Sequence, residues 1–139
     1  MNAALVDTGA FVALFDDAER RFEHYRTVIA ALAGEGVRLL STWPCVTEAS
    51  YLLAPRNHFA LLEWLASGMV SIEHFEQEDL AQMVAWMQRY SERGKTLMDF
   101  ADASLYWLAH RADTHIVLTV DQNDFSRYRL PDGRAFEIL

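Results

Sequence analysis

Short apolar segments alternate along this chain with longer segments in which apolar residues recur every three or four positions. Four segments have the length and composition of strands that are buried on both faces: residues 3–6, 37–41, 70–72 and 116–119. A strand followed by a helix and a parallel strand forms a right-handed crossover, which places the helix against the sheet. The alternation therefore predicts an α/β fold with a parallel central sheet and helices on both faces.

Residues that stop helices mark the boundaries of the helical segments. Gly34 and Gly36 end one helix, Gly94 ends another, and the break at residues 42–44 separates a strand from the helix after it. The predicted helices cover residues 10–15, 22–32, 46–53, 59–67, 78–92 and 98–111. The sequence contains no internal repeat, low-complexity segment or linker, so we expect a single domain over residues 1–139.

The bulk composition limits the class of protein. At 139 residues, of which 52% are hydrophobic, the chain can bury a core without a covalent staple. Cys45 is the only cysteine, which excludes an intrachain disulfide and a thiolate zinc site. The chain has no apolar run of bilayer length and begins without a signal-type segment, so we expect a cytoplasmic protein with no membrane contact.

The net charge of −8 argues against a broad basic surface for nucleic acid, because phosphate contacts usually come from Lys and Arg. This objection weakens if several acids surround a divalent cation, since the bound metal then supplies the positive charge that meets a phosphate.

Four acidic residues occupy positions where ligands bind in α/β folds. Asp7, Glu48 and Asp121 stand where a predicted strand gives way to a loop or helix, and Asp102 is near the start of a helix. Carboxylates that meet at one sheet edge repel each other unless a cation offsets their charge, and oxygen ligands suit Mg²⁺ or Mn²⁺. Such a site can hold a scissile phosphate, activate a bound water and stabilise the leaving oxygen, as phosphodiester hydrolysis requires.

Further residues beside these acids are accessory candidates. Thr8 and Thr119 carry hydroxyls that could hold a carboxylate or a water, and Asp99 lies one helical turn before Asp102. Asp99 replaces Asp102 as a ligand if the helix starts later than predicted. Asp124 competes in the same way with Asp121.

Four motifs resemble those of PIN domains, in the family's order and over nearly the entire chain. They are Leu-Val-Asp-Thr-Gly-Ala-Phe at 5–11, Val-Thr-Glu-Ala at 46–49, Ala-Asp-Ala-Ser-Leu at 101–105 and Leu-Thr-Val-Asp-Gln-Asn-Asp-Phe at 118–125. The likeness is greatest to the VapC-type toxins of bacterial toxin–antitoxin pairs, which are single PIN domains of this length.

The resemblance implies roles for the acids and partners for the protein. Asp7 and Asp102 match the principal metal ligands, and Glu48 and Asp121 match the acids that complete the site directly or through water. The family also implies a three-layer fold, a homodimer, inhibition by a VapB-type antitoxin, and Mg²⁺- or Mn²⁺-dependent cleavage of structured RNA of the tRNA or rRNA class. Residues 51–53 and 59–67 offer a candidate apolar surface for dimer or antitoxin contact.

Simpler interpretations exist for each residue. Asp7 alone suits a turn, Glu48 a solvated helix face, and Asp99 a helix cap. The five histidines have no metal-ligand spacing. Packing in the core or in an interface explains the tryptophans better than base stacking does: Trp43, Trp64, Trp86 and Trp107.

The combined pattern favours a metal-dependent endoribonuclease that acts as the toxin of a toxin–antitoxin pair, with metal-activated water as the nucleophile. One alternative is a non-catalytic interaction module with the same fold, although a pure scaffold gains nothing from clustered negative charge. The other is a metal-dependent phosphohydrolase for a small phosphorylated substrate. That alternative lacks a glycine-rich phosphate loop, since Gly9 by itself does not form one.

Overall fold

Five parallel strands form one sheet in the computed structural model, in the order β3-β2-β1-β4-β5. The strands are β1 (Ala3–Val6), β2 (Arg38–Thr42), β3 (Ser71–Glu73), β4 (Ile116–Leu118) and β5 (Glu137–Ile138). The structure describes residues 2–16, 18, 21–91 and 97–139. Every residue of the central strand β1 is buried, as expected of a continuous apolar segment with neighbours on both edges. The predicted parallel sheet is confirmed.

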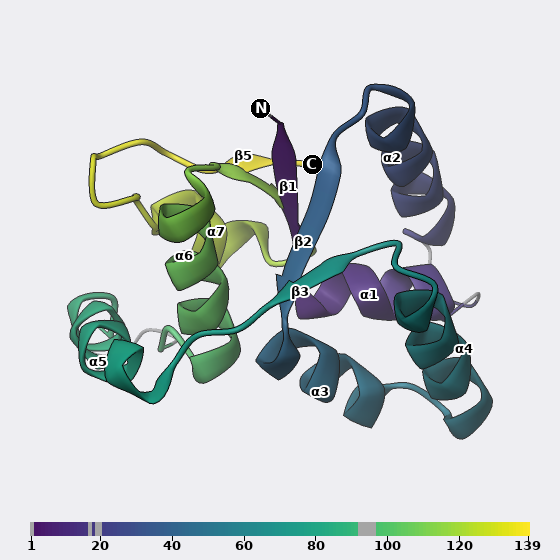
Figure 1. The fold of residues 1–139 in the computed structure, drawn as a ribbon, viewed down its shortest axis with the longest axis horizontal. Coiled ribbons are helices and arrows are strands. Elements are labelled where there is room, and N and C mark those ends of the chain that lie inside the picture. The colour runs from purple at the N-terminus through teal and green to yellow at the C-terminus, as the bar shows by residue number, and fades with distance from the viewer. Residues whose placement is uncertain (1, 17, 19–20, 92–96) are drawn as a thin grey trace.

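Helices cover both faces of this sheet, as predicted. They are α1 (Thr8–Phe15), α2 (Phe22–Gly34), α3 (Trp43–Leu52), α4 (Pro55–Ala66), α5 (Leu80–Arg89), α6 (Phe100–Ala112) and α7 (Gln122–Arg127), with a 3-10 turn at Gln77–Asp79. Figure 1 shows α1, α2 and α4 on one side of the strands and α5, α6 and α7 on the other. Within the described residues, none of the helices combines the length and the apolar character needed to cross a bilayer.

Helix α6 is the most deeply placed helix. It contacts β1 and β2 on one side and packs against α3 and α5 on others, so every residue from 101 to 109 is buried. This position carries Asp102, in the first turn of α6, into the interior near the carboxyl ends of the strands.

Several helix boundaries differ from the predictions. The predicted break at 42–44 is wrong, because α3 begins at Trp43 and accommodates Pro44 in its first turn, where a missing N–H costs little. Helix α4 begins at Pro55 for the same reason, four residues earlier than predicted. Helix α5 is shorter than the predicted segment 78–92, and Glu92 and Gly94 lie outside the described residues. Two short elements, α7 and β5, were not predicted at all.

Candidate metal centre

The register of two central strands brings Asp7 and Thr119 together. In the parallel pair of β1 and β4, Val6 lies beside Leu118, so the next residues of both strands are neighbours at the sheet edge. The Asp7 N–H donates to the Leu118 carbonyl at 3.0 Å, and the Thr119 hydroxyl donates to Asp7 Oδ2 at 2.7 Å. Asp7 is only 5% exposed. Burial raises the pKa of Asp7 to about 6, although the Thr119 hydrogen bond acts in the opposite direction.

The start of α6 holds Asp102 in a fixed position. Asp99 is the N-cap residue, and its Oδ1 accepts the backbone N–H of Asp102 at 2.8 Å. Asp102 itself is 7% exposed, and its Oδ2 accepts the hydroxyl of Tyr128 at 2.7 Å. Burial raises the pKa of Asp102 to about 8, and the negative charges of Asp7 and Asp99 add to the shift.

The start of α7 repeats the same local arrangement. Asp121 caps the helix and accepts the backbone N–H of Asp124 at 3.1 Å. The Thr119 hydroxyl oxygen accepts the Asp121 N–H at 2.9 Å, which ties the cap to the end of β4. Burial raises the pKa of Asp121. The Asp124 carboxylate is buried and forms an ion pair with Arg127 at 3.1 Å.

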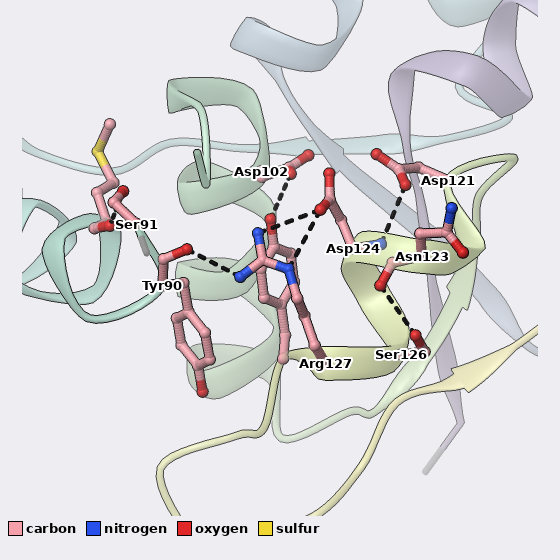
Figure 2. Close-up of polar contacts among 10 residues, drawn as sticks. Tyr90, Ser91, Asp102, Asp121, Asn123, Asp124, Ser126 and Arg127 are labelled. Atoms are coloured by element: carbon pink, nitrogen blue, oxygen red, sulfur yellow. Dashed lines mark hydrogen bonds and ion pairs between the residues drawn. The ribbon is translucent and has the colours of Figure 1, made fainter. Parts of the chain in front are cut away.

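Three of these carboxylates converge. Oxygen atoms of Asp102, Asp121 and Asp124 all lie within 4.8 Å of one another, and Figure 2 shows the three side chains gathered between α6 and α7 with Arg127 beside them. A set of carboxylate oxygens without nitrogen or sulfur suits a hard cation such as Mg²⁺ or Mn²⁺. Burial, and after it the charges of neighbouring aspartates, raise the pKa values of Asp7 and Asp102, so the ionised carboxylates gain from a cation beside them. The donor set therefore fits the metal that the sequence predicted.

The remaining site candidates lie around this trio. Asp7 is outside it, yet near enough for its charge to raise the pKa of Asp102. Glu48 is exposed on α3 and accepts a hydrogen bond from the Thr8 hydroxyl at 3.5 Å. Partial burial and the charge of Asp99 raise the pKa of Glu48. Because both residues are exposed, Glu48 and Asp99 form a more open rim of the acidic centre. The accessory candidate Asp124 belongs to the trio itself.

Three residues that contact the acids were not predicted from the sequence. Tyr128 comes from the residue after α7, 26 positions from Asp102, and no local pattern links the two. Arg127 follows Asp124 by three residues, a helical spacing that indicates an ion pair between them. Cys45 is fully buried, and its thiol lies 3.9 Å from Asp7 Oδ1. Burial raises the pKa of this thiol, so Cys45 stays protonated and acts as a weak donor to Asp7.

Gly9 has a packing role in this site. A Cβ atom at this position would lie 2.2 Å from a methyl group of Val120, closer than real side chains approach. The glycine therefore allows the first turn of α1 to pack against the segment that leads from β4 to Asp121. It brings Asp7 toward the other acids without forming a phosphate loop.

Comparison with known proteins assigns the family. The family model of the PIN domain matches residues 4–130, so the chain belongs to the PIN-domain family and the predicted resemblance is confirmed. No curated protein matches the sequence.

Two solved structures share the fold. One is Mycobacterium tuberculosis VapC20, described as a sarcin-ricin loop cleaving toxin, with a TM-score of 0.74, 19% identity and coverage of 87% of this chain and 92% of that chain. The other is a chain of Rickettsia felis VapBC2 bound to a DNA fragment from its promoter, with a TM-score of 0.71, 13% identity and coverage of 99% and 98%. At these identities the similarity shows a common fold.

Proposed function

We propose that this protein is a metal-dependent endoribonuclease and the toxin of a toxin–antitoxin pair. The observation that carries the proposal is the convergence of Asp102, Asp121 and Asp124 next to buried Asp7, at the carboxyl edge of a PIN-domain sheet. We further propose that residues 1–139 act as one PIN domain and that the reaction takes place in the cytoplasm, where the RNA is found.

Each acid has a distinct role in this proposal. Asp7 and Asp102 are the inner ligands, Asp121 and Asp124 complete the cation site directly or through water, and Glu48 accepts protons or hydrogen bonds at its open rim. When bound, Mg²⁺ or Mn²⁺ supplies positive charge for the scissile phosphate and activates the attacking water. Thr119 and Tyr128 hold the carboxylates of Asp7 and Asp102 in place, so little reorganisation is needed during the reaction.

Structured RNA is the proposed substrate class, because the similar VapC20 is described as cleaving the sarcin-ricin loop. A VapB-type antitoxin is the proposed partner, because the other similar chain comes from a VapBC complex. The surface available to it is an apolar groove of about 580 Å³ between α1, α2 and α4, whose walls include Phe15, Phe22 and Trp64. We also propose a homodimer, for which Leu52, Phe59 and Leu62 offer exposed apolar side chains.

The test compares growth and RNA cleavage by three forms of the chain: the wild type, the Asp7→Ala, Asp102→Ala double variant, and an Asp132→Asn control. Asp132 is exposed and pairs with Arg134 outside the acidic centre. We expect the wild type and the control to arrest growth of a bacterial host and to cleave RNA with Mn²⁺ but not with EDTA. The double variant should do neither, while keeping the wild-type circular dichroism spectrum.

Three outcomes would contradict the proposal. Cleavage by the double variant at the wild-type rate would exclude these acids as the active site. Failure of the wild type to cleave any RNA with either metal would instead favour an interaction module, and hydrolysis of small phosphate esters alone would favour a phosphohydrolase.

A further inference from the structure

A groove with aromatic walls opens next to the acidic centre. It has a volume of about 800 Å³ and lies between α3 and the first residues of α6. Glu48 and Asp99, the rim of the acidic centre, also line this groove. Whatever occupies the groove therefore lies beside the proposed cleavage site.

The wall from α3 carries exposed rings. Trp43, Thr47 and Tyr51 are spaced four residues apart, so they form one row along the helix and all three line the groove. Trp43 is 47% exposed and Tyr51 is 88% exposed. Trp86 and Trp107 are buried in the core, whereas Trp43 lies outside the core, so of the two predicted environments, core or interface, only an interface remains for Trp43.

The opposite wall is aromatic and firmly supported. Phe75 follows β3, and its ring packs edge-to-face against Phe100 at 5.6 Å and against buried Trp107 at 5.9 Å. Phe100 is the first residue of α6, directly after Asp99, and is 44% exposed. The rings are thus held in place before any ligand binds, which reduces the entropy lost on binding.

The charges of the groove disfavour a phosphate as its occupant. Among the described residues that line it, none is Lys or Arg, and two are carboxylates. A second pocket of about 280 Å³ borders the acidic centre at Asp121 and differs from the groove, because its lining includes Arg21 and two side-chain amides. A nucleic-acid strand would therefore place its backbone toward the pocket with Arg21, and a flat, uncharged base toward the aromatic groove.

We propose that the groove is a nucleobase-stacking subsite, which binds an unpaired base next to the scissile phosphate of the RNA. The inference rests on the proposed nuclease function and specifies its substrate: RNA whose bases are unstacked at the cleavage point, as in a loop. Aromatic side chains bind single-stranded RNA in this way, because every base has a π face. Glu48 and Asp99 would accept hydrogen bonds from amino groups of the stacked base.

The test uses a synthetic RNA hairpin that the wild type cleaves in its loop, and versions with one abasic loop position each. The variants are Trp43→Leu and Tyr51→Leu, which keep an apolar side chain but remove the ring, and Trp43→Phe, which keeps an aromatic ring. Val84→Ala is the control, because Val84 is exposed on α5 outside the groove.

We expect one abasic position beside the cut to slow the wild type by about 10-fold, and Trp43→Leu to slow cleavage of the intact hairpin by a similar factor. Combining the two should cause no further loss, because both remove the same stacking contact. Trp43→Phe should restore most of the rate. Mn²⁺ affinity should remain at the wild-type value in every variant, since none of them changes an acidic ligand.

Three results would overturn the inference. The first is wild-type cleavage by both Trp43→Leu and Tyr51→Leu. The second is a combined loss of cleavage rate equal to the product of the two separate losses, which would show that the ring and the base act independently. The third is unchanged cleavage with weakened dimerisation or antitoxin binding, which would assign the groove to a protein partner. If the wild type itself cleaves no RNA, the proposed function fails and this inference fails with it.

Discussion

The starts of α6 and α7 have the same local structure and different electrostatic partners. In each, an aspartate caps the helix and accepts the N–H of a second aspartate three residues later, Asp99 with Asp102 and Asp121 with Asp124. The second aspartate is buried in both cases. Asp102, however, receives a neutral hydroxyl from Tyr128, whereas Asp124 receives the guanidinium of Arg127.

This difference shows how one local motif can serve two purposes. At the start of α7, the charge of Asp124 is already offset by Arg127, so the carboxylate is stable without metal. At the start of α6, the hydroxyl of Tyr128 orients Asp102 without neutralising it. In the proposed function, Asp102 on the α6 side is therefore the carboxylate that most needs a cation, whereas Asp124 on the α7 side is already held in place by Arg127.

The largest expected effect is on catalysis, where both sides should matter. Replacing Asp102 or Asp124 by asparagine should each lower the rate of RNA cleavage by roughly 100-fold and weaken Mn²⁺ binding, because each variant removes a charged oxygen ligand. Cleavage rates and Mn²⁺ titrations would check this. Wild-type activity of Asp124→Asn would remove Asp124 from the metal site and leave it as a partner of Arg127.

The stability of the metal-free protein should depend on pH through the α6 side. The folded-state pKa of Asp102 is about 8 and that of Asp7 about 6, both above the value of 3.8 expected in the unfolded chain. The folded state then binds more protons than the unfolded state in this range. The contribution of these two groups to the free energy of unfolding is therefore complete below about pH 4 and is lost as pH rises through 6 and 8. We expect the melting temperature in EDTA to fall by roughly 5 °C or more across this window.

Added Mn²⁺ should reverse this loss, because the cation stabilises the ionised carboxylates and binds the folded state. A melting temperature in EDTA that rises over the same window would contradict the electrostatic account of Asp102.

Stability should change in opposite directions when the two buried aspartates are neutralised. In EDTA at about pH 9, Asp102→Asn should raise the melting temperature by roughly 4 °C, because it removes an unmatched buried charge. Asp124→Asn should lower it by a similar amount, because Arg127 then loses its partner. Asp132→Asn, at an exposed pair, should cause little change. Shifts of the same sign in both buried variants would mean that the two sites do not differ as described.

The smallest effect concerns the orientation of Asp102. Tyr128→Phe removes the hydroxyl and keeps the ring, so it should weaken Mn²⁺ binding by about 10-fold and cost roughly 1 kcal/mol of stability. Tyr106→Phe is the control. The ring of Tyr106 is also buried, and its hydroxyl donates to the Arg129 carbonyl, away from the acids. Equal Mn²⁺ affinity of the two variants would show that the Tyr128 hydroxyl does not position Asp102.

Much of the fold could be predicted, and the exceptions share a physical cause. The strands over residues 3–6 and 116–118 are continuous apolar segments, and the longer helices have enough apolar residues to show a period. Helix α7 has six residues and β5 has two, which is too short for any period to appear. Strand β5 exists because Glu137 and Ile138 pair with β4, a contact that local sequence does not encode.

The chain by itself determined where the acids stand. Apolar strands end at Asp7 and near Asp121, and the spacing of three residues within 99–102 and 121–124 makes each first aspartate a cap for the second. These are local properties, because they depend on hydrophobic pattern and on backbone groups within one helical turn.

Only the tertiary structure decided which of these acids converge and how each is balanced. The register of β1 with β4 places Asp7 beside Thr119, and the packing of α6 and α7 brings Asp102 to Asp124. Burial then raises the pKa of Asp102, an effect that exists only once the surrounding core has removed water from the carboxylate.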